Sequence, residues 1–124
     1  MDQRIQTAMD LMAKDLQRDF SLYALARSVN LSLSRFHHLF KAETGMTPAR
    51  YLRSLRLEQA RELLATSFLS IKQLMRCVGF TDQSHFNHEF KRAYRLTPTE
   101  YRALARSSAQ SRRGLPRVAE VDNK

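Results

Sequence analysis

Two short stretches of the sequence hold most of the side chains that could bind a polar ligand. All four histidines lie in them, at positions 37, 38, 85 and 88, among serine, arginine, glutamine, asparagine and lysine residues. Such groups form hydrogen bonds to base edges and phosphate oxygens of nucleic acids. No Ser-His-Asp, Cys-His or paired-carboxylate pattern stands out, and the sequence has no glycine-rich phosphate loop. We therefore expect a binding protein rather than an enzyme, with no cofactor.

Histidine spacing raises the question of a metal ion. His85 and His88 are three residues apart, which allows two imidazoles on one helix to share a metal. However, no triad with a carboxylate or a thiol converges in the sequence, and the two histidine pairs belong to different segments. Contact with bases or phosphates explains their placement better, so we expect no metal site.

The charge balance favours a polyanionic partner. Lys and Arg number 21 against 12 Asp and Glu, a formal net charge of +9, and 16 of the cations are arginines. The planar guanidinium suits phosphates and base edges, so an arginine-rich excess points towards nucleic acid. No stretch is long and apolar enough to cross a membrane, and the first ten residues do not resemble a secretory leader. We expect a cytoplasmic, nucleoid-associated protein with no membrane partner.

The single cysteine agrees with a reducing compartment. Cys77 can form no disulfide within the chain and belongs to no C-x-x-C pair. It matches Ser28 in the internal repeat described below, on a short packed helix. We expect it to be a small buried residue rather than a redox sensor.

The elements that must position these side chains are all helical, because apolar residues recur at helical spacing and Gly and Pro number only three each. We expect an all-α fold of about seven helices. Helical patterns cover residues 2–18, 22–29, a run from 33 that Gly45 and Pro48 bring to an end, 49–64, 71–78 and a segment around 86–93. Thr97-Pro98-Thr99-Glu100 is a capping-box start for a helix to about 106. The expected division is an N-terminal helix and first unit (1–48), a linker helix (49–65), a second unit with a closing helix (66–106) and a disordered basic tail (107–124).

An internal repeat relates the two units. Residues 22–51 match residues 71–101 at an offset of 49 up to the turn and of 50 after it. Asn30 and Gly79 occupy the same turn position, and both residue types tolerate the left-handed backbone that a sharp turn often needs. Each half therefore reads as a helix-turn-helix. The matched pairs are Leu25 and Leu74, Arg27 and Arg76, Val29 and Val78, Leu31 and Phe80, Ser34 and Ser84, Phe36 and Phe86, Phe40 and Phe90, Lys41 and Lys91, Pro48 and Pro98, and Tyr51 and Tyr101.

The second helix of such a motif can enter the major groove while its apolar face stays on the core. At 100° per residue, the expected core sides are Leu33, Phe36, Phe40 and Glu43 in the first unit and Phe86, Phe90 and Ala93 in the second. We interpret the aromatic residues as core rather than as a platform for stacking single-stranded bases. The outward sets are Ser34, His38, Lys41 and Ala42, flanked by Arg35 and His37, and Ser84, Asn87, His88, Lys91 and Arg92, with Gln83 near the helix start.

Residues 21–102 resemble the DNA-binding domain of the AraC/XylS family of bacterial transcription regulators. The most specific piece is VGFTDQSHFNHEFKRAYRLTPTEYR at 78–102, and TPARYLRSLRLEQARELL at 47–64 is similar to the family's linker helix. The resemblance implies two helix-turn-helix units joined by that helix and bound to adjacent major-groove segments of double-stranded DNA. It also implies promoter activation through RNA polymerase, without a small-molecule site in this part of the chain.

The resemblance assigns roles to individual residues. Base contacts would come from Ser34, Arg35, His37 and His38 in the first unit and from Gln83, Ser84, Asn87 and His88 in the second, with Lys41 and Lys91 on phosphates. The sequence departs from the family pattern in two places: many members have Arg where this chain has His38 and His88, and Arg95 stands where the first copy has Gly45. Glu89 replaces Leu39 of the first copy, and the sequence does not show what it contacts.

Two alternatives stay open at this stage. The chain could be a helix-turn-helix module that binds a protein and has lost base readout, or a basic protein that coats nucleic acid without preference. The linker arginines Arg50, Arg53, Arg56 and Arg61 could form a solvated face or could contact phosphates.

Overall fold

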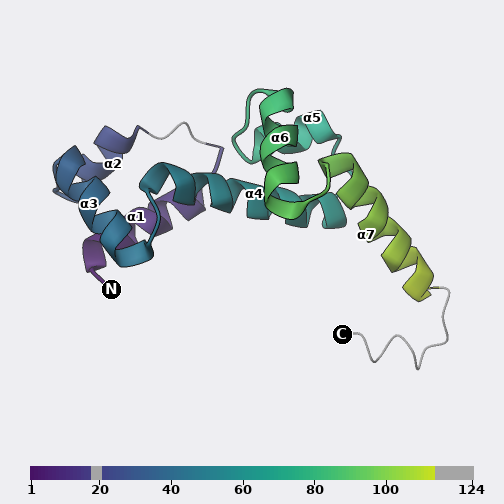
Figure 1. Ribbon diagram of the computed structural model, residues 1–124, viewed down its shortest axis with the longest axis horizontal. Helices are drawn as coiled ribbons and strands as arrows, with labels where there is room; N and C mark the ends of the chain where they lie inside the picture. The colour runs from purple at the N-terminus through teal and green to yellow at the C-terminus, as the bar shows by residue number, and fades with distance from the viewer. Residues whose placement is uncertain (18–20, 114–124) are drawn as a thin grey trace.

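The computed structural model describes residues 1–17 and 21–113, with side chains as far as residue 108, and all regular structure in these ranges is helical (Figure 1). The predicted all-α fold of seven helices is confirmed. Their bounds are α1 Gln3–Lys14, α2 Leu22–Ser28, α3 Leu33–Thr44, α4 Pro48–Thr66, α5 Ile71–Cys77, α6 Gln83–Tyr94 and α7 Pro98–Arg113.

Serine hydroxyls cap the starts of α2, α3 and α5. The side chains of Ser21, Ser32 and Ser70 each accept the backbone N–H three residues ahead. The capping box expected at α7 is present, since the Glu100 carboxylate accepts the N–H of Thr97 at 2.9 Å and the Thr97 hydroxyl accepts the N–H of Glu100 at 3.1 Å.

Two predicted helix ends are wrong. α1 stops at Lys14 rather than at 18, and the carbonyl of Leu16 instead accepts a hydrogen bond from the Arg56 side chain at 3.1 Å. α7 continues to Arg113, so residues 107–113 of the expected disordered tail are helical. No Gly or Pro lies between Pro98, at the start of α7, and Gly114, and a helix that projects from the body needs no apolar stripe to continue (Figure 1). The rest of the expected tail, 114–124, lies outside the described residues.

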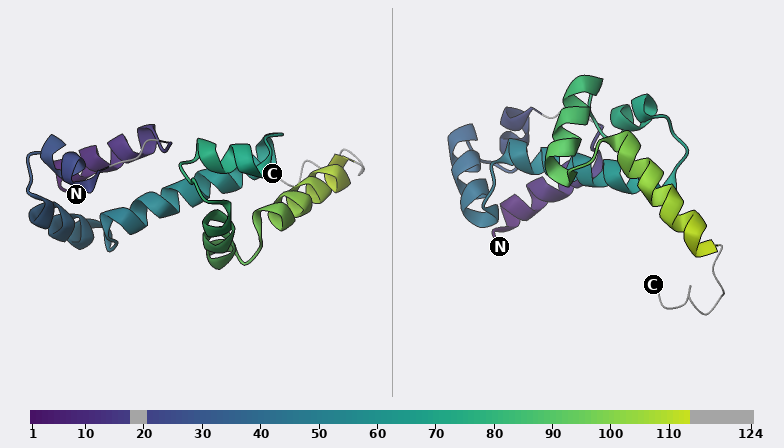
Figure 2. Two further views of the ribbon diagram at one scale, coloured as in Figure 1. Left: turned by 90° about the horizontal axis from the view of Figure 1, so that it is seen from above. Right: turned by 45° about the vertical axis from the view of Figure 1, so that its right-hand side comes forward.

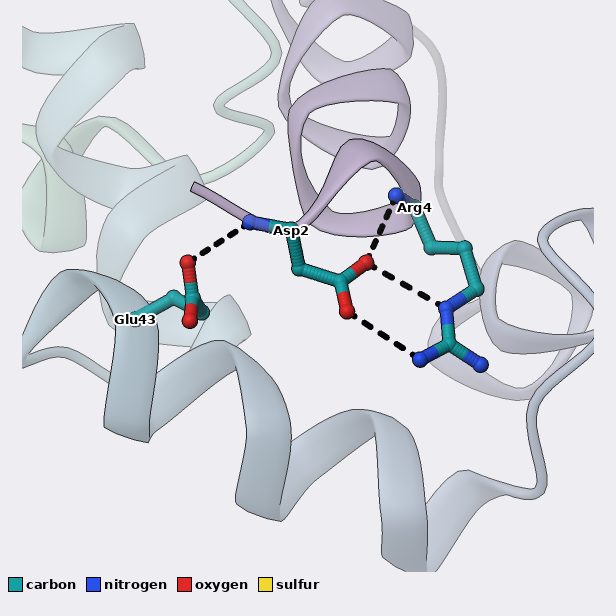
Figure 3. A network of polar contacts seen from close by, with 3 residues as sticks. All are labelled: Asp2, Arg4 and Glu43. Atoms are coloured by element: carbon teal, nitrogen blue, oxygen red, sulfur yellow. Dashed lines mark hydrogen bonds and ion pairs between the residues drawn. The ribbon is translucent and has the colours of Figure 1, made fainter.

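A polar network fixes the start of α1 (Figure 3). The Asp2 carboxylate accepts the backbone N–H of Arg4 at 2.8 Å and hydrogen bonds from its guanidinium, while the Asp2 N–H donates to Glu43 Oε1 at 2.8 Å. The side-chain hydrogen bond from Arg4, followed by the backbone one, lowers the pKa of Asp2. The stabilisation from the contact between Asp2 and Arg4 is therefore fully present above the ordinary carboxyl pKa, and it is lost as the pH falls through the lowered pKa of Asp2.

Two hydrophobic cores share the long helix α4. Leu52 belongs to the first core, which also holds Phe36 and Phe40, and Leu57, Ala60 and Leu64 belong to the second. Figure 1 shows α1, α2 and α3 gathered at one end of α4 and α5, α6 and α7 at the other. Four of the aromatic rings expected in the cores are confirmed there, since Phe36, Phe40, Phe86 and Phe90 are all 0% exposed. Tyr51 and Tyr101, also expected as core, are only partly buried and pack against the two cores.

Arg102 of α7 secures the C-terminal end of α4. Its guanidinium donates hydrogen bonds to the carbonyl oxygens of Leu64, at 3.2 Å, and of Ser67 and Leu69. These bonds include a carbonyl of the last helical turn, which has no partner within the helix. Burial lowers the pKa of Arg102, with nearby Arg106 acting in the same direction. α7 is thereby held against α4 by directed contacts as well as by packing.

The turn of the second unit lies against the chain that leaves α1. A Cβ added to Gly79 would lie 2.4 Å from the backbone oxygen of Leu16 and 2.6 Å from Nε of Arg56. Arg56 lies on α4 and donates to that same oxygen. Three parts of the chain therefore meet at one point: Leu16 after α1, Arg56 of α4 and Gly79 of the second turn. Only a glycine at position 79 leaves room for the Leu16 oxygen and the Arg56 side chain.

We predict that Gly79→Ala destabilises the protein by about 2 kcal/mol or more, because a methyl group there collides with a backbone oxygen and the φ of 99° is already unfavourable for a side chain. Gly45→Ala is the matched control. Its φ is 79°, but nothing lies within 4 Å of the added Cβ, so it should cost only about 1 kcal/mol. Chemical denaturation of both variants measures the difference, and equal losses would contradict a packing role for Gly79.

Candidate nucleic-acid interface

The two helix-turn-helix units have the same local construction. In each, a helix of 7 residues is followed by a left-handed turn residue and a helix of 12 residues. The turn residues are Asn30, with φ 63°, and Gly79, with φ 99°. The N–H of the next residue then donates back into the first helix, from Leu31 to Ala26 at 3.0 Å and from Phe80 to Met75 at 2.9 Å. The repeat detected in the sequence is therefore a repeat of hydrogen bonds as well.

The first candidate recognition helix is α3. Its residues Phe36 and Phe40 are buried in the core. The predicted site residues of the same helix are all exposed: Ser34, Arg35, His37, His38 and Lys41. The structure brings four of them together, because one open hollow is lined by Leu33, Ser34, His37, His38, Lys41 and Ala42. Arg35 lies outside that hollow.

Two residues expected on the core side of α3 are not there. Leu33, the first residue of α3, is 42% exposed. Glu43 is also exposed and accepts the N–H of Asp2. Both residues lie in the end turns of α3, where solvent around Leu33 and a polar contact of Glu43 with the start of α1 take the place of core packing.

The second candidate recognition helix, α6, buries Phe86 and Phe90. Gln83, Ser84, His88 and Lys91 are exposed, and Asn87 is partly buried. Ala93 is exposed and not packed in the core as expected, because only one side of the last turn of α6 is covered. The predicted residues of α6 thus lie on its solvent side, with Asn87 at the border.

Both recognition helices have defined ends. Asp82 caps α6, and its carboxylate accepts the N–H groups of Ser84 at 2.9 Å and of His85 at 3.3 Å. At the other end Arg95 adopts the left-handed conformation, with φ 73°, and donates its N–H to the carbonyl of Lys91 at 2.7 Å. Gly45 does the same for α3 with φ 79°. The second unit therefore keeps the same helix end as the first, with a strained non-glycine residue.

Glu89, whose partners the sequence did not show, lies between two cations. Its carboxylate is 3.7 Å from Arg53 of α4 and 3.9 Å from Nε2 of His85, and its side chain is only 12% exposed. In the sequence, Arg53 stands out only as one of several linker arginines. The missing signal was three-dimensional, because residues 53 and 89 come together only after α6 packs on α4.

The expectation for Cys77 is wrong, since the thiol is exposed. It ends α5 on the solvent side, like Ser28 in the first unit.

Within the described residues, no group of three His, Cys, Asp or Glu side chains is placed to hold a metal ion. No helix in the described part of the chain is long and apolar enough to cross a membrane.

Comparison with known proteins decides the family. A family model described as a helix-turn-helix domain matches residues 25–104. The arabinose operon regulatory protein of Escherichia coli K12 is 35% identical over 104 residues, covering 83% of this chain and 36% of that protein. The chain belongs to the AraC/XylS family. Its relatives include the transcriptional activator RhaS of Escherichia coli SE11, 40% identical over 79 residues, which cover 64% of this chain and 28% of that protein.

Solved structures of AraC-type DNA-binding domains share the fold. The DNA-binding domain of AdpA, a global transcriptional factor solved with a target DNA, superposes with a TM-score of 0.81 at 27% identity, covering 84% of this chain and 94% of that one. An AraC-type regulator from Chromobacterium violaceum gives 0.78 at 31% identity, covering 83% and 92%. This member of the AraC/XylS family spans about a third of the length of its first curated relatives, 34%, 37% and 36%. The family consists of DNA-binding transcription regulators and not of enzymes.

The cap of α6 yields a stability prediction. Asp82→Ala should destabilise the protein by about 1 kcal/mol, because two backbone N–H groups of the first turn lose their acceptor. Asp82→Asn keeps an acceptor oxygen and should cost much less. Denaturant unfolding monitored by circular dichroism checks both, and similar losses for the two variants would show that the charge of Asp82, and not its capping oxygen, is what matters.

Proposed function

We propose that this chain is a sequence-specific, double-stranded DNA-binding transcription regulator whose helices α3 and α6 read adjacent major-groove segments. The observation that carries the proposal is the pair of equivalent, exposed polar faces on these two helices, at opposite ends of one continuous helix. Both helices run steeply across the direction of α4 in Figure 1. At about 1.5 Å per residue, the 19 residues of α4 span about 28 Å. This length is compatible with recognition helices about one DNA turn, roughly 34 Å, apart.

The side-chain types suit the task. An asparagine such as Asn87 can pair with adenine through two hydrogen bonds, and an arginine such as Arg35 can pair with guanine. His38 and His88 present single ring nitrogens and no guanidinium fork, so their readout differs from that of the arginines frequent at these positions in the family. Contacts to bases are assigned to Ser34, Arg35, His37, His38, Gln83, Ser84, Asn87 and His88, and contacts to phosphates to Lys41 and Lys91.

Further features of the proposal come from the relatives. RhaS is described as a transcriptional activator, which supports activation through RNA polymerase at a promoter. A regulator of this kind acts in the cytoplasm, in association with the nucleoid. The net charge of +9 fits such a partner, because a basic surface gathers on DNA before it finds its site.

Selection of bound sequences from a random duplex pool at about 0.15 M salt tests the function directly. We expect one motif with two short enriched blocks about one helical turn apart. For binding through roughly 6 to 8 phosphates, the logarithm of affinity should fall with the logarithm of salt at a slope of about −5 to −7. A shallow slope without an enriched motif would instead identify a protein-interaction module, and a steep slope without one a nonspecific coat protein.

Single substitutions separate base readout from backbone contact. His38→Ala or Asn87→Ala should weaken binding to the selected site by about 1–3 kcal/mol and leave binding to a scrambled duplex unchanged, because base contacts exist only on the correct sequence. Lys41→Ala is the control and should weaken binding to both duplexes alike. Equal losses on both duplexes for His38→Ala and Asn87→Ala would reassign these residues to the DNA backbone.

A further inference from the structure

A basic groove separates the two helix-turn-helix units. It is bounded on one side by the first half of α4 and on the other by α6, so it lies between the parts of the protein that carry the two recognition helices. In the view from above, α6 projects from the C-terminal half of α4 while α3 lies at its N-terminal end (Figure 2). The groove is lined by Met46, Arg50, Arg53, Ser54, Leu57, Glu89, Arg92 and Ala93.

Arg53 occupies the centre of this region. It lines the groove beside α6 and also a second groove, which contains Thr81, His85 and Gly79 of the second unit. Its side chain is 44% exposed. Among the residues lining the first groove, three arginines face one carboxylate, so a formal charge of +2 faces the space between the units.

The ion pair between Arg53 and Glu89 is long. The guanidinium is 3.7 Å from the carboxylate of Glu89, longer than the roughly 2.7–2.9 Å of a charge-assisted hydrogen bond. Glu89 is 12% exposed and is also 3.9 Å from His85, so its carboxylate is fixed by the helix that carries it, while Arg53 is not locked onto it. The free N–H groups of a half-exposed guanidinium can therefore turn towards an anion that enters the groove.

We infer that this groove binds the phosphodiester backbone of the DNA stretch between the two major-groove segments, with Arg53 as its central phosphate ligand and Glu89 as a competing carboxylate. Arg92, which lies on the expected outward side of α6, lines the same groove as Arg50 and Arg53 of α4. DNA that follows both α3 and α6 would therefore pass its backbone beside these three arginines. Glu89 keeps Arg53 over the groove in the free protein and lowers the attraction for any phosphate. The inference rests on the proposed function, since it assigns a place to DNA already bound at both units.

Salt titration of the full chain on a selected and a scrambled duplex tests the role of Arg53. Arg53→Ala should weaken binding to both duplexes alike, by roughly three- to tenfold at low salt, and should flatten the log–log salt slope by about 0.9, the value for one lost phosphate contact. Lys14→Ala is the matched control: it removes one exposed cation from α1, away from the groove, and should leave the slope unchanged. An unchanged slope for Arg53→Ala would overturn the inference.

Glu89→Gln provides a test of opposite sign that loss of folding cannot imitate. Removing the competing charge should tighten binding to both duplexes by roughly two- to fivefold, whereas a purely structural ion pair predicts unchanged or weaker binding. Weaker or equal binding by Glu89→Gln would overturn the role of Glu89. Failure of the proposed function looks different, because the unmodified chain would then bind both duplexes equally or not at all, whereas failure of the groove leaves its sequence preference intact.

Discussion

The structure depends on one constraint: α4 must complete two hydrophobic cores at once. Leu52 packs into the first core, and Leu57, Ala60 and Leu64 pack into the second, so the two cores follow each other along one helix. A helix without an internal proline, glycine or bulge resists sharp bending, since a kink breaks backbone hydrogen bonds. The positions of the two units are therefore coupled through the helical geometry of α4. A residue inserted into α4 would rotate one unit against the other by about 100°.

α4 alone would fix the distance and the rotation between the two helix-turn-helix units. Further contacts between the units and α4 stabilise this arrangement. The Leu16 oxygen, reached by the chain after α1, accepts from Arg56 and presses against Gly79 of the second turn, so the N-terminal segment spans both units. At the other end, Arg102 ties α7 to the carbonyl oxygens at the end of α4. The ion pair of Arg53 and Glu89 adds a weaker, more exposed link on the side of α6. Rigid spacing of this kind suits a ligand with a fixed repeat, because a rigid protein loses less entropy on binding.

Local patterns in the sequence were sufficient for most of the fold. Serine and threonine caps, apolar periodicity and the repeat predicted the helices and their buried aromatic rings, because these features depend on neighbours within a few residues. The predictions failed where the structure depends on contacts, or on the lack of contacts, between residues far apart in the sequence. Beyond the end of α1 at Lys14, the carbonyl of Leu16 accepts a hydrogen bond from Arg56, a residue 40 positions away, and Cys77 is exposed at the end of α5. In the candidate interface, helical spacing placed the residues of α3 and α6 on exposed faces, but the groove around Arg53 and Glu89 arises only from packing between helices.

A carboxylate in a strongly basic groove has a physical rationale in the balance between affinity and specificity. Phosphate contacts raise affinity for every DNA sequence, whereas only base contacts distinguish one site from the many competing ones. Each added cation strengthens both kinds of binding equally, so it lengthens residence at wrong sites without improving discrimination. Glu89 opposes Arg53 on the side of α6 that faces α4. In the proposed complex it would lower the attraction for phosphates, which is common to all DNA sequences, without taking the place of a proposed base contact. An apolar residue, like Leu39 at the matching position of the first unit, could not do this.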